Sequence, residues 1–409
     1  MKALACRLCG APLSEPFIDL GLSPLSNSLV DEKDLAAPDA MYPLCAYACE
    51  HCWLVQVPEC TTPERIFREY AYFSSYSTTW LAHVRRYADD MRSRLRLDAG
   101  SLVIEVASND GHLLTEFASA QVPVLGIEPA RNVASVAIAN GIPTISEFLT
   151  AASGRALRSQ GRAADLLVAN NVLAHVPELH DFIAGLAALL KPTGMLTLEF
   201  PHLARMLERV EFDTIYHEHF SYFSLLTAQR ALEEHGLQVV DVEELPTHGG
   251  SLRVYAMHAG RTSVAPAVAQ MHVREEEAGL RRRETYARFA SQASSTREEL
   301  ARFLRGAAAE GAAVVGYGAP AKATTLLNYC GVGTDVLPYT VDRSPHKQGK
   351  YIPGVRTPIF APERIFETRP DYIVILPWNI ADEVIGQMST ASAWGARFIV
   401  PIPSPVVVA

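Results

Sequence analysis

The sequence predicts an α/β protein: a small cysteine-rich module, then a doubly wound and mostly parallel sheet, then a second, smaller α/β domain. This fold class rests on two observations. Continuous apolar segments of strand length alternate with helical patterns between residues 78 and 260 and again after residue 311, as is typical of parallel sheets covered by helices. Six of the seven cysteines fall within the first 60 residues, which is typical of a module stabilised by a metal ion.

The length of 409 residues predicts two or three domains. Hydrophobic residues make up 49% and charged residues 20% of the chain, as in ordinary globular proteins. The net charge of -9 and the absence of a basic stripe argue against nucleic-acid binding. No segment reaches the roughly 18 apolar residues of a membrane span, and the N-terminus has no apolar signal core. We therefore expect a cytoplasmic protein that binds neither nucleic acid nor membranes.

The cysteine-rich module contains two CxxC pairs, Cys6 with Cys9 and Cys49 with Cys52. Four thiolates satisfy a tetrahedral zinc ion and leave no open position, so the spacing predicts a structural zinc site. Cys45 is an alternative ligand to Cys49. Unligated core cysteines are the simplest alternative, and a redox CxxC would need a βαβ context that is missing here.

The central region is predicted to contain the following elements in order. Strands begin at Leu102 and Val124, lie at 143–146, begin at Asp165 and lie at 195–200; helices begin near His112 and lie at 131–140, 178–190 and 227–235; a turn lies at 191–194; and two strands at 237–245 and 251–258 form an antiparallel edge hairpin. Helical periodicity at 265–310 predicts a helical linker to the last domain.

The segment after the first strand, SNDG, resembles the E/D-x-G-x-G-x-G loop that binds S-adenosylmethionine. Glu105 and Gly111 match this pattern, whereas Ala107 and Asn109 stand at the other glycine positions. Such a loop needs a tight turn that lets the backbone approach a ligand, and the small side chains of Ala107 and Ser108 permit it.

Polar side chains also follow the next strands. Glu128 ends the second strand, where an acid can accept hydrogen bonds from ribose hydroxyls. The same layout would suit NAD, but the loop lacks GxGxxG. Asn170, Asn171 and His175 follow the fourth strand, and the carboxyl ends of parallel strands share one edge of the sheet.

The densest run of functional side chains is Tyr216-His-Glu-His-Phe-Ser-Tyr-Phe-Ser224. Two imidazoles, a carboxylate and a phenol can supply a base, a group that orients it and a hydrogen-bond donor. A metal site built on His217 and His219 is an alternative, although this spacing is not that of HExxH. A solvated polar loop is the non-functional alternative.

The last domain opens with a strand, the turn Gly316-Tyr-Gly-Ala-Pro-Ala-Lys322 and a helix. Backbone amides and Lys322 could meet a diphosphate there. Asp342 ends the next strand and Lys347 follows it. The alternative is a Rossmann-like unit that serves only an interface. Further candidates are Tyr317, Asn328 and Asn379.

Taken together, these residues resemble a family of C-methyltransferases that act on thymidine-diphosphate-linked 4-keto-deoxysugars in antibiotic biosynthesis. The resemblance runs the length of the chain, through Cys6-x-x-Cys9, PLSNSLV, YPL, Tyr72-Phe-Ser-Ser75, Glu105-Val-Ala-Ser-Asn-Asp-Gly111, Gly126-Ile-Glu-Pro129, Asn170-Asn-Val-Leu-Ala-His175-Val-Pro, Tyr216–Ser224, Thr247-His-Gly-Gly-Ser-Leu-Arg-Val-Tyr255 and Gly316–Lys322.

The resemblance implies a zinc-binding module at 1–70, a class I S-adenosylmethionine-binding domain at 71–262, a helical linker at 263–310 and a Rossmann-like sugar-nucleotide-binding domain at 311–409. It implies a monomer or homodimer with a small-molecule substrate. The site residues it implies are catalytic Tyr70, His175, Tyr216, Glu218 and His219; cofactor-binding Glu105, Ala107, Ser108, Asn109, Gly111, Glu128, Pro129, Asn170 and Asn171; and substrate-binding Tyr72, Tyr222, His248, Tyr317, Lys322, Asn328, Asp342, Lys347 and Asn379.

The chemistry follows from the ketone, which acidifies the neighbouring C-3 and C-5. We hypothesise that His219 removes the C-3 proton, that Tyr216 or His175 stabilises the enolate oxygen, and that Glu218 orients a histidine. C-5 methylation is the alternative regiochemistry. A nicotinamide-dependent sugar oxidoreductase and a non-enzymatic zinc scaffold are the alternatives from other classes.

Overall fold

The computed structural model describes residues 4–62, 66 and 78–408. They form two compact units, each built from three stretches of chain. Unit 1 comprises Met1–Leu13, Cys49–Ala204 and Phe220–Arg281, and unit 2 comprises Ser14–Ala48, Arg205–His219 and Arg282–Ala409. No helix in the described part of the chain is long and apolar enough to cross a membrane. The domain boundaries given above stay predictions.

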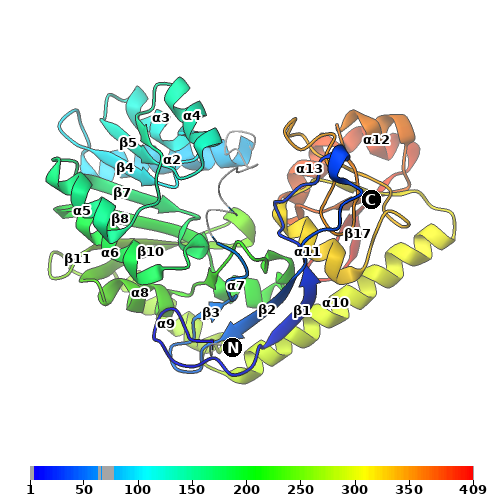
Figure 1. The fold of residues 1–409 in the computed structure, drawn as a ribbon, viewed down its shortest axis with the longest axis horizontal. Coiled ribbons are helices and arrows are strands. Elements are labelled where there is room, and N and C mark those ends of the chain that lie inside the picture. The colour runs from blue at the N-terminus through cyan, green and yellow to red at the C-terminus, as the bar shows by residue number, and fades with distance from the viewer. Residues whose placement is uncertain (1–3, 63–65, 67–77, 409) are drawn as a thin grey trace. The chain divides into compact units, whose positions relative to one another are not determined.

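The described residues of unit 1 form a seven-stranded sheet in the order β10-β11-β8-β7-β4-β5-β6 (Figure 1). Strands from β8 to β6 are parallel, whereas β10 and β11 are antiparallel to each other and β11 is antiparallel to β8. The predicted doubly wound sheet with its edge hairpin is therefore confirmed. Its strands are β4 (Val103–Val106), β5 (Val124–Ile127), β6 (Thr144–Ile145), β7 (Ala164–Asn170), β8 (Leu190–Pro201), β10 (Leu237–Leu245) and β11 (Ser251–His258).

Helices cover both faces of this sheet because alternate strand residues face opposite ways. On one face, Leu166 and Val168 pack with side chains of α2 and α3. On the other, Leu167 and Ala169 pack with side chains of α6 and α8. The helices of unit 1 are α2 (Thr78–Leu95), α3 (His112–Ser119), α4 (Arg131–Ala139), α5 (Ala151–Ser159), α6 (Leu179–Leu189), α8 (Leu225–Glu233) and α9 (Pro266–Glu277).

Two local features differ from the sequence expectation. Helix α5 was not predicted, because its buried face consists of Ala151, Gly154 and Leu157, in which only one side chain is large and apolar. A capping box between Thr150 and Ser153 begins it, and Gly154 lets it pack directly on the backbone at Gly185 of α6. The predicted turn at 191–194 lies inside β8, where the residues between Leu190 and Met195 bulge out of the ladder with β7.

Unit 2 contains a six-stranded sheet within its described residues, in the order β14-β13-β12-β15-β16-β17, parallel except for the last pair. The strands are β12 (Val314–Tyr317), β13 (Thr340–Val341), β14 (Ile359–Phe360), β15 (Tyr372–Ile375), β16 (Arg397–Val400) and β17 (Val406–Val408); the helices are α7 (Leu203–Glu208, begun in unit 1), α10 (Arg283–Ala309), α11 (Ala321–Cys330), α12 (Glu363–Thr368) and α13 (Ala381–Gln387).

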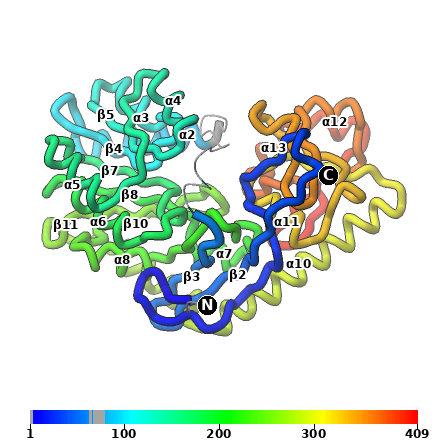
Figure 2. The backbone as a smooth tube through the Cα atoms, in the orientation of Figure 1, coloured from blue at the N-terminus to red at the C-terminus, as the bar shows by residue number. Residues whose placement is uncertain are grey.

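The N-terminal stretch of unit 2 is an antiparallel hairpin of β1 (Ile18–Ser23) and β2 (Tyr42–Ala48) with its flanking residues. Phe17 lies against two buried aromatic rings of α10, with centroids 5.2 Å from Tyr286 and 6.1 Å from Phe289. Val30 exchanges two backbone hydrogen bonds with Tyr351, each of 2.9 Å. Figure 2 shows this early segment running beside the C-terminal part of the chain within unit 2.

Candidate active site

The four predicted zinc ligands converge in unit 1. The two CxxC pairs form knuckles of one design: Gly10 N–H donates to the Cys6 carbonyl, and Trp53 N–H donates to the Cys49 carbonyl. Both Gly10 and Trp53 have positive φ, 72° and 66°. This shared turn places both sulfurs of each pair on the same side.

The sulfur atoms of Cys6, Cys9, Cys49 and Cys52 all lie within 4.8 Å of one another. Sγ–Sγ distances of 3.5 Å join Cys6 to Cys52 and Cys9 to Cys49, close to the roughly 3.8 Å expected around tetrahedral zinc. Cys45 lies outside this group, and burial raises the pKa of its thiol to about 11. The donor set therefore fits a structural zinc ion, and Cys45 is not a ligand.

Among the described residues, this is the one group of three or more His, Cys, Asp or Glu side chains that converges in this way. His217 and His219 instead direct ring nitrogens to separate backbone carbonyls, those of Pro43 and Thr214. The structure therefore gives no support to a metal site at these histidines.

The loop after β4 adopts the tight turn that its sequence predicts. Ala107, Asn109 and Gly111 all have positive φ, 58°, 50° and 77°. At Gly111, the residue before α3, a Cβ atom would lie 3.1 Å from Ala137 Cβ and Ile142 Cγ1. Glycine at this position is therefore needed both for the backbone conformation and for close packing.

Glu128, which follows β5, holds this loop. Its two carboxylate oxygens accept backbone N–H groups of Asn109 (2.9 Å) and Ala130 (2.8 Å). Each oxygen has further lone pairs that a ribose hydroxyl could use. The predicted ribose-binding acid and the predicted loop therefore lie together.

Glu105, at the carboxyl end of β4, is buried, and its Oε2 has no hydrogen-bond partner among the described residues. Burial raises its pKa well above the ordinary value, and the negative charges of Asp110 and Glu128 add to this. A buried polar atom without a partner is uncommon. Because it lies beside the β4 loop, Glu105 is a candidate for ligand contact.

The end of β7 contacts the β10–β11 connection. Asn171 has a positive φ of 52° and its Nδ2 donates to His248 Nε2 at 3.3 Å. His248 is itself left-handed, with φ 55°. The Oδ1 atoms of Asn170 and Asn171 are buried without a described partner, so two acceptors remain for a ligand at the end of β7. The predicted residues Asn171 and His248 are therefore brought together.

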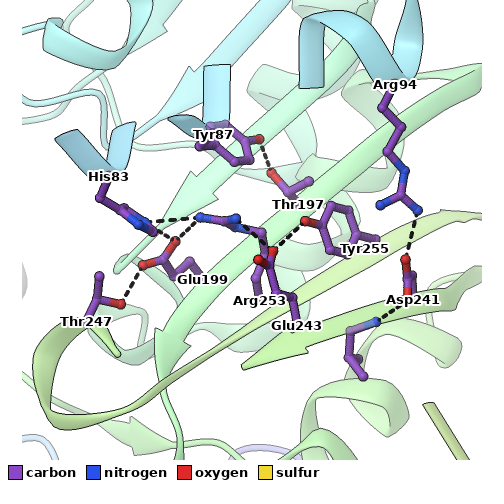
Figure 3. Close-up of polar contacts among 11 residues, drawn as sticks. His83, Tyr87, Arg94, Thr197, Glu199, Asp241, Glu243, Thr247, Arg253 and Tyr255 are labelled. Carbon is purple, nitrogen blue, oxygen red and sulfur yellow. Dashed lines mark hydrogen bonds and ion pairs between the residues drawn. The ribbon is translucent and has the colours of Figure 1, made fainter. Parts of the chain in front are cut away.

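A buried carboxylate, Glu199 on β8, organises this region, as Figure 3 shows. Its Oε2 accepts from Arg253 at 2.7 Å and from His83 at 2.9 Å, and its Oε1 accepts from Thr247 Oγ1 at 2.9 Å. Its backbone carbonyl accepts the Asn171 N–H at 2.7 Å. Glu199 thus binds Asn171 on one side of the Asn171–His248 contact and, on the other side, Thr247, the residue before His248.

The electrostatics of Glu199 follow from these partners. Burial alone would raise its pKa, but the hydrogen bond from His83 and the charge of Arg253 outweigh it and lower the pKa to about 2. Sequence reasoning did not identify this network. A signal existed: Glu199 and Arg253 are opposite charges within apolar strands, and they pair directly across the β8–β11 ladder.

The histidine proposed as base, His219 in unit 2, is held in one tautomer. Its Nδ1 lies 3.0 Å from the Thr214 carbonyl, which can only accept, so Nδ1 carries the proton. Nε2 then has the lone pair and accepts from the Tyr216 hydroxyl at 2.8 Å, with ring centroids 4.0 Å apart. The structure therefore brings together the predicted base and phenol, with Thr214 as an unpredicted orienting group.

The neighbouring acid, Glu218, is buried and bonds elsewhere in unit 2. Its Oε1 accepts the Asn27 N–H at 3.0 Å, and burial raises the pKa of this carboxyl. Asn27 belongs to the PLSNSLV motif, so the carboxylate ties two motifs of the chain together.

The other predicted catalytic and substrate residues lie as follows. His175 belongs to the short 3-10 helix Leu173–His175 in unit 1. Tyr222 is buried in β9 (Ser221–Tyr222), which pairs with β3 (Val55–Gln56). Tyr70 and Tyr72 lie outside the described residues.

In unit 2, as in unit 1, a carboxylate after a neighbouring strand accepts a backbone N–H of the glycine loop. Asp342, just after β13, accepts the Ala319 N–H at 2.8 Å, as Glu128 does for Asn109. Lys347 Nζ donates to the Ala319 carbonyl at 2.9 Å and lies 3.5 Å from the Asp342 carboxylate. The predicted pair Asp342 and Lys347 therefore both meet this loop.

Lys322 and Asn379 also meet, with Nζ donating to Oδ1 at 2.7 Å. The ammonium lies 4.1 Å from the centroid of Trp378, whose indole N–H donates to Asp213 at 2.7 Å. The negative charges of two buried acids, Glu211 and Asp213, also act on this lysine, which the sequence analysis proposed for a diphosphate. Sequence reasoning missed both acids, which lie in another stretch of chain.

Tyr317 and Asn328 form hydrogen bonds with other residues of unit 2. The Tyr317 hydroxyl donates to Gln387 Oε1 at 2.9 Å, and the Asn328 amide donates to the carbonyls of Thr324 and Pro353 at 2.8 and 3.0 Å.

The buried acids give unit 2 a pH-dependent stability. Burial raises the pKa of Glu211 to about 7, although Lys322 opposes the shift. The unfolded carboxyl titrates near 4.5, so the folded protein gives up this proton less readily and loses stability as pH rises towards 7. We expect Glu211→Gln to stabilise unit 2 by about 1–3 kcal/mol at pH 8 and much less at pH 5, measured by urea unfolding.

The matched control is Glu208→Gln, an exposed acid of the neighbouring helix whose side chain is 61% accessible. It should show no such difference between the two pH values. An equal effect of Glu211→Gln at pH 5 and pH 8 would contradict a raised pKa.

Comparison with known proteins covers nearly the whole chain. Residues 6–67 match a family described as a putative zinc binding domain, 80–242 a methyltransferase domain and 246–403 a C-methyltransferase C-terminal domain. The chain is 38% identical to C-methyltransferase NovU of Streptomyces niveus over 404 residues, which is 98% of this chain and 96% of that protein.

More distant similarities are narrower. A 101-residue stretch is 30% identical to an uncharacterized methyltransferase of Mycobacterium leprae and covers 25% of this chain and 37% of that protein. Among solved structures, magnesium protoporphyrin IX methyltransferase of Synechocystis with bound S-adenosylmethionine aligns with a TM-score of 0.36 and 16% identity, over 50% of this chain and 100% of that chain.

Proposed function

Because the chain belongs to the C-methyltransferase family, we propose that it methylates C-3 of a thymidine-diphosphate-linked 4-keto-deoxysugar. It is an S-adenosylmethionine-dependent enzyme with a four-cysteine zinc site. This membership sets aside the oxidoreductase and the scaffold. The substrate, the carbon and the base are the content of the proposal, with C-5 as the alternative carbon.

The chemistry needs a carbon nucleophile. A C-4 ketone lowers the pKa of the proton on C-3, so a positioned base can remove that proton and leave an enolate. When bound, S-adenosylmethionine supplies an electrophilic methyl group. The protein must therefore provide a base with an available lone pair and a donor for the enolate oxygen.

One observation carries the assignment of the base: His219 is fixed with its proton on Nδ1 and its lone pair on Nε2. The C-3 proton would pass to Nε2 as the C–H electron pair forms the C-3–C-4 double bond and the π pair of the carbonyl moves to its oxygen. Tyr216, which donates to the same nitrogen, would turn its hydroxyl towards that oxygen, and His175 is the second candidate for this role. A donor of this kind contributes about 3–4 kcal/mol.

The chain's own residues also suggest where the ligands bind. The S-adenosylmethionine site is assigned to the β4 loop with Glu105 and Glu128, and to Asn170 and Asn171 at the end of β7. The Asp342 and Lys347 pair is proposed for the sugar nucleotide. Further residues proposed on the sequence resemblance are Pro129, Tyr70, Tyr72, Glu218, Tyr222, His248, Tyr317, Lys322, Asn328 and Asn379.

A zinc site made of four thiolates suits a reducing compartment, which supports the cytoplasm as the place of action. The enzyme would act there as a monomer or homodimer.

The direct test is incubation with S-adenosylmethionine and a panel of thymidine-diphosphate 4-keto-deoxysugars, followed by mass spectrometry and NMR of the product. A single methyl gained at C-3 is the expected result. A methyl group at C-5 would show that the base removes the proton on the other side of the ketone, and would overturn C-3 as the methylated carbon. Binding of the cofactor without any product across the panel would overturn the proposed substrate class.

A further inference from the structure

Arg7 lies between the first two zinc ligands, Cys6 and Cys9, yet its contacts are with other parts of unit 1. Its guanidinium donates to the carbonyl of Val57 at 3.1 Å and to the carbonyl of Phe220, and lies 3.4 Å from Ser221 Oγ. It is also stacked 5.7 Å from the Phe220 ring centroid. An arginine inside the zinc knuckle thus binds the segment of chain that directly follows His219.

The segment at Phe220 also forms hydrogen bonds through its own backbone. Phe220 N–H donates to the Ala174 carbonyl at 2.8 Å, and Val57 N–H donates to the Phe220 carbonyl at 3.1 Å. Ala174 directly precedes His175, and β9, with Tyr222, begins at Ser221. The backbone of Phe220 is therefore the place where the zinc module and the His175 turn meet within unit 1.

The knuckle itself is anchored a second time. His180 Nε2 lies 2.9 Å from the Leu8 carbonyl, so this nitrogen donates to the knuckle backbone. The Arg7 N–H donates to Gln56 Oε1 at 3.1 Å. Since a bound metal fixes the cysteines on either side of Arg7 and Leu8, both anchors depend on the conformation that the ion imposes.

We propose that Arg7 is a positioning residue for the reaction: it couples the zinc knuckle to the segment Phe220–Tyr222 and thereby sets the conformation of His175, Tyr222 and the adjoining His219. An arginine with a purely structural role would stabilise the fold as a whole, without a specific effect on the conformation of this segment. The inference rests on the proposed roles of these site residues, but its main measurement needs no substrate.

The test compares Arg7→Met, which keeps the apolar stem and removes the donors, with Arg158→Met in the full-length zinc-loaded enzyme. Arg158 is a matched control because its guanidinium also donates to two backbone carbonyls of unit 1, those of Ala188 and Leu190, at 3.1 and 3.0 Å. Each variant is measured for zinc content, S-adenosylmethionine affinity, hydrogen exchange and kcat.

For Arg7→Met we expect full zinc content and cofactor affinity within about twofold of the parent, because the ligands and the β4 loop are unchanged. Amide exchange at residues 217–224 should rise roughly tenfold to hundredfold, and kcat should fall by a similar factor with little change in KM. Arg158→Met should raise exchange only near residues 188–190 and leave kcat within about threefold. Arg7→Lys should recover part of the loss, since it keeps a charge and donors but not the fork.

Two results would overturn the inference: unchanged exchange at 217–224 in Arg7→Met, or a loss of kcat no larger than that of Arg158→Met. If Arg7→Met does not fold, Arg7→Lys carries the same comparison. Removing zinc from the parent with a chelator must also raise exchange at 217–224, and retained protection there would refute the coupling. Failure of the sugar substrate would stop the kcat measurement but would leave the exchange result readable.

Discussion

His219→Asn is expected to lower kcat by about 10³-fold, the middle of the range for a general base, while S-adenosylmethionine affinity stays within about twofold. Asparagine is the informative replacement because its amide N–H can still donate to the Thr214 carbonyl, as Nδ1 does at 3.0 Å. What it removes is the Nε2 lone pair. The measurements are single-turnover rates and calorimetric cofactor binding.

A second readout isolates proton removal from methyl transfer. In D₂O without the methyl donor, the parent should exchange the C-3 proton of the keto sugar for deuterium, and His219→Asn should not. The control is His217→Gln, two residues away, which can keep the bond to the Pro43 carbonyl that His217 makes at 3.2 Å. A His219→Asn rate within about tenfold of that control would remove His219 as the base.

Glu199→Gln is expected to destabilise unit 1 by about 3–5 kcal/mol, because it leaves the buried Arg253 without its main counter-charge. Arg253 is only 4% exposed, and its 2.7 Å contact with Glu199 is fully buried, whereas its second carboxylate partner, Glu243, has a 47% exposed side chain. Glu243→Gln is therefore the matched control, with an expected loss of about 0–1 kcal/mol. Hydrogen exchange of β8 and β11 at increasing urea measures each loss within unit 1.

The same substitution tests the functional reach of the network. Glu199 holds Thr247 with its side chain and Asn171 with its carbonyl, so we expect cofactor affinity to weaken in Glu199→Gln and not in Glu243→Gln. Equal stability loss in the two variants would show that the buried ion pair has no special weight. The double variant Glu199→Leu with Arg253→Met should recover much of the stability, since a buried pair can be replaced by apolar contacts.

Local signals in the sequence were sufficient for much of this architecture. Apolar strand lengths located the parallel sheet, and the paired CxxC spacing located the zinc ligands, because each depends on neighbours in the chain. Helix α5 was missed because its buried face is made mostly of small residues, with Gly154 packed on Gly185.

One part of the candidate site could be predicted because its side chains belong to a single motif. Tyr216 and His219 fall three residues apart and do meet. The group that sets the tautomer of His219 is a backbone carbonyl, which any residue at position 214 would offer. The residue type at 214 therefore does not predict this hydrogen bond. Lys322 shows the opposite limit: acids from a distant stretch, Glu211 and Asp213, determine its surroundings.

The interlacing of unit 2 has a consequence for synthesis on the ribosome. Within the described chain, the aromatic partners of Phe17 are Tyr286 and Phe289, and about 270 residues separate them from Phe17. At about 5–20 residues per second, the first hairpin waits roughly 15–50 s for the surface that buries it. The segment made first is thus among the last to be completed, and nascent chains should need protection there by chaperones until α10 has emerged.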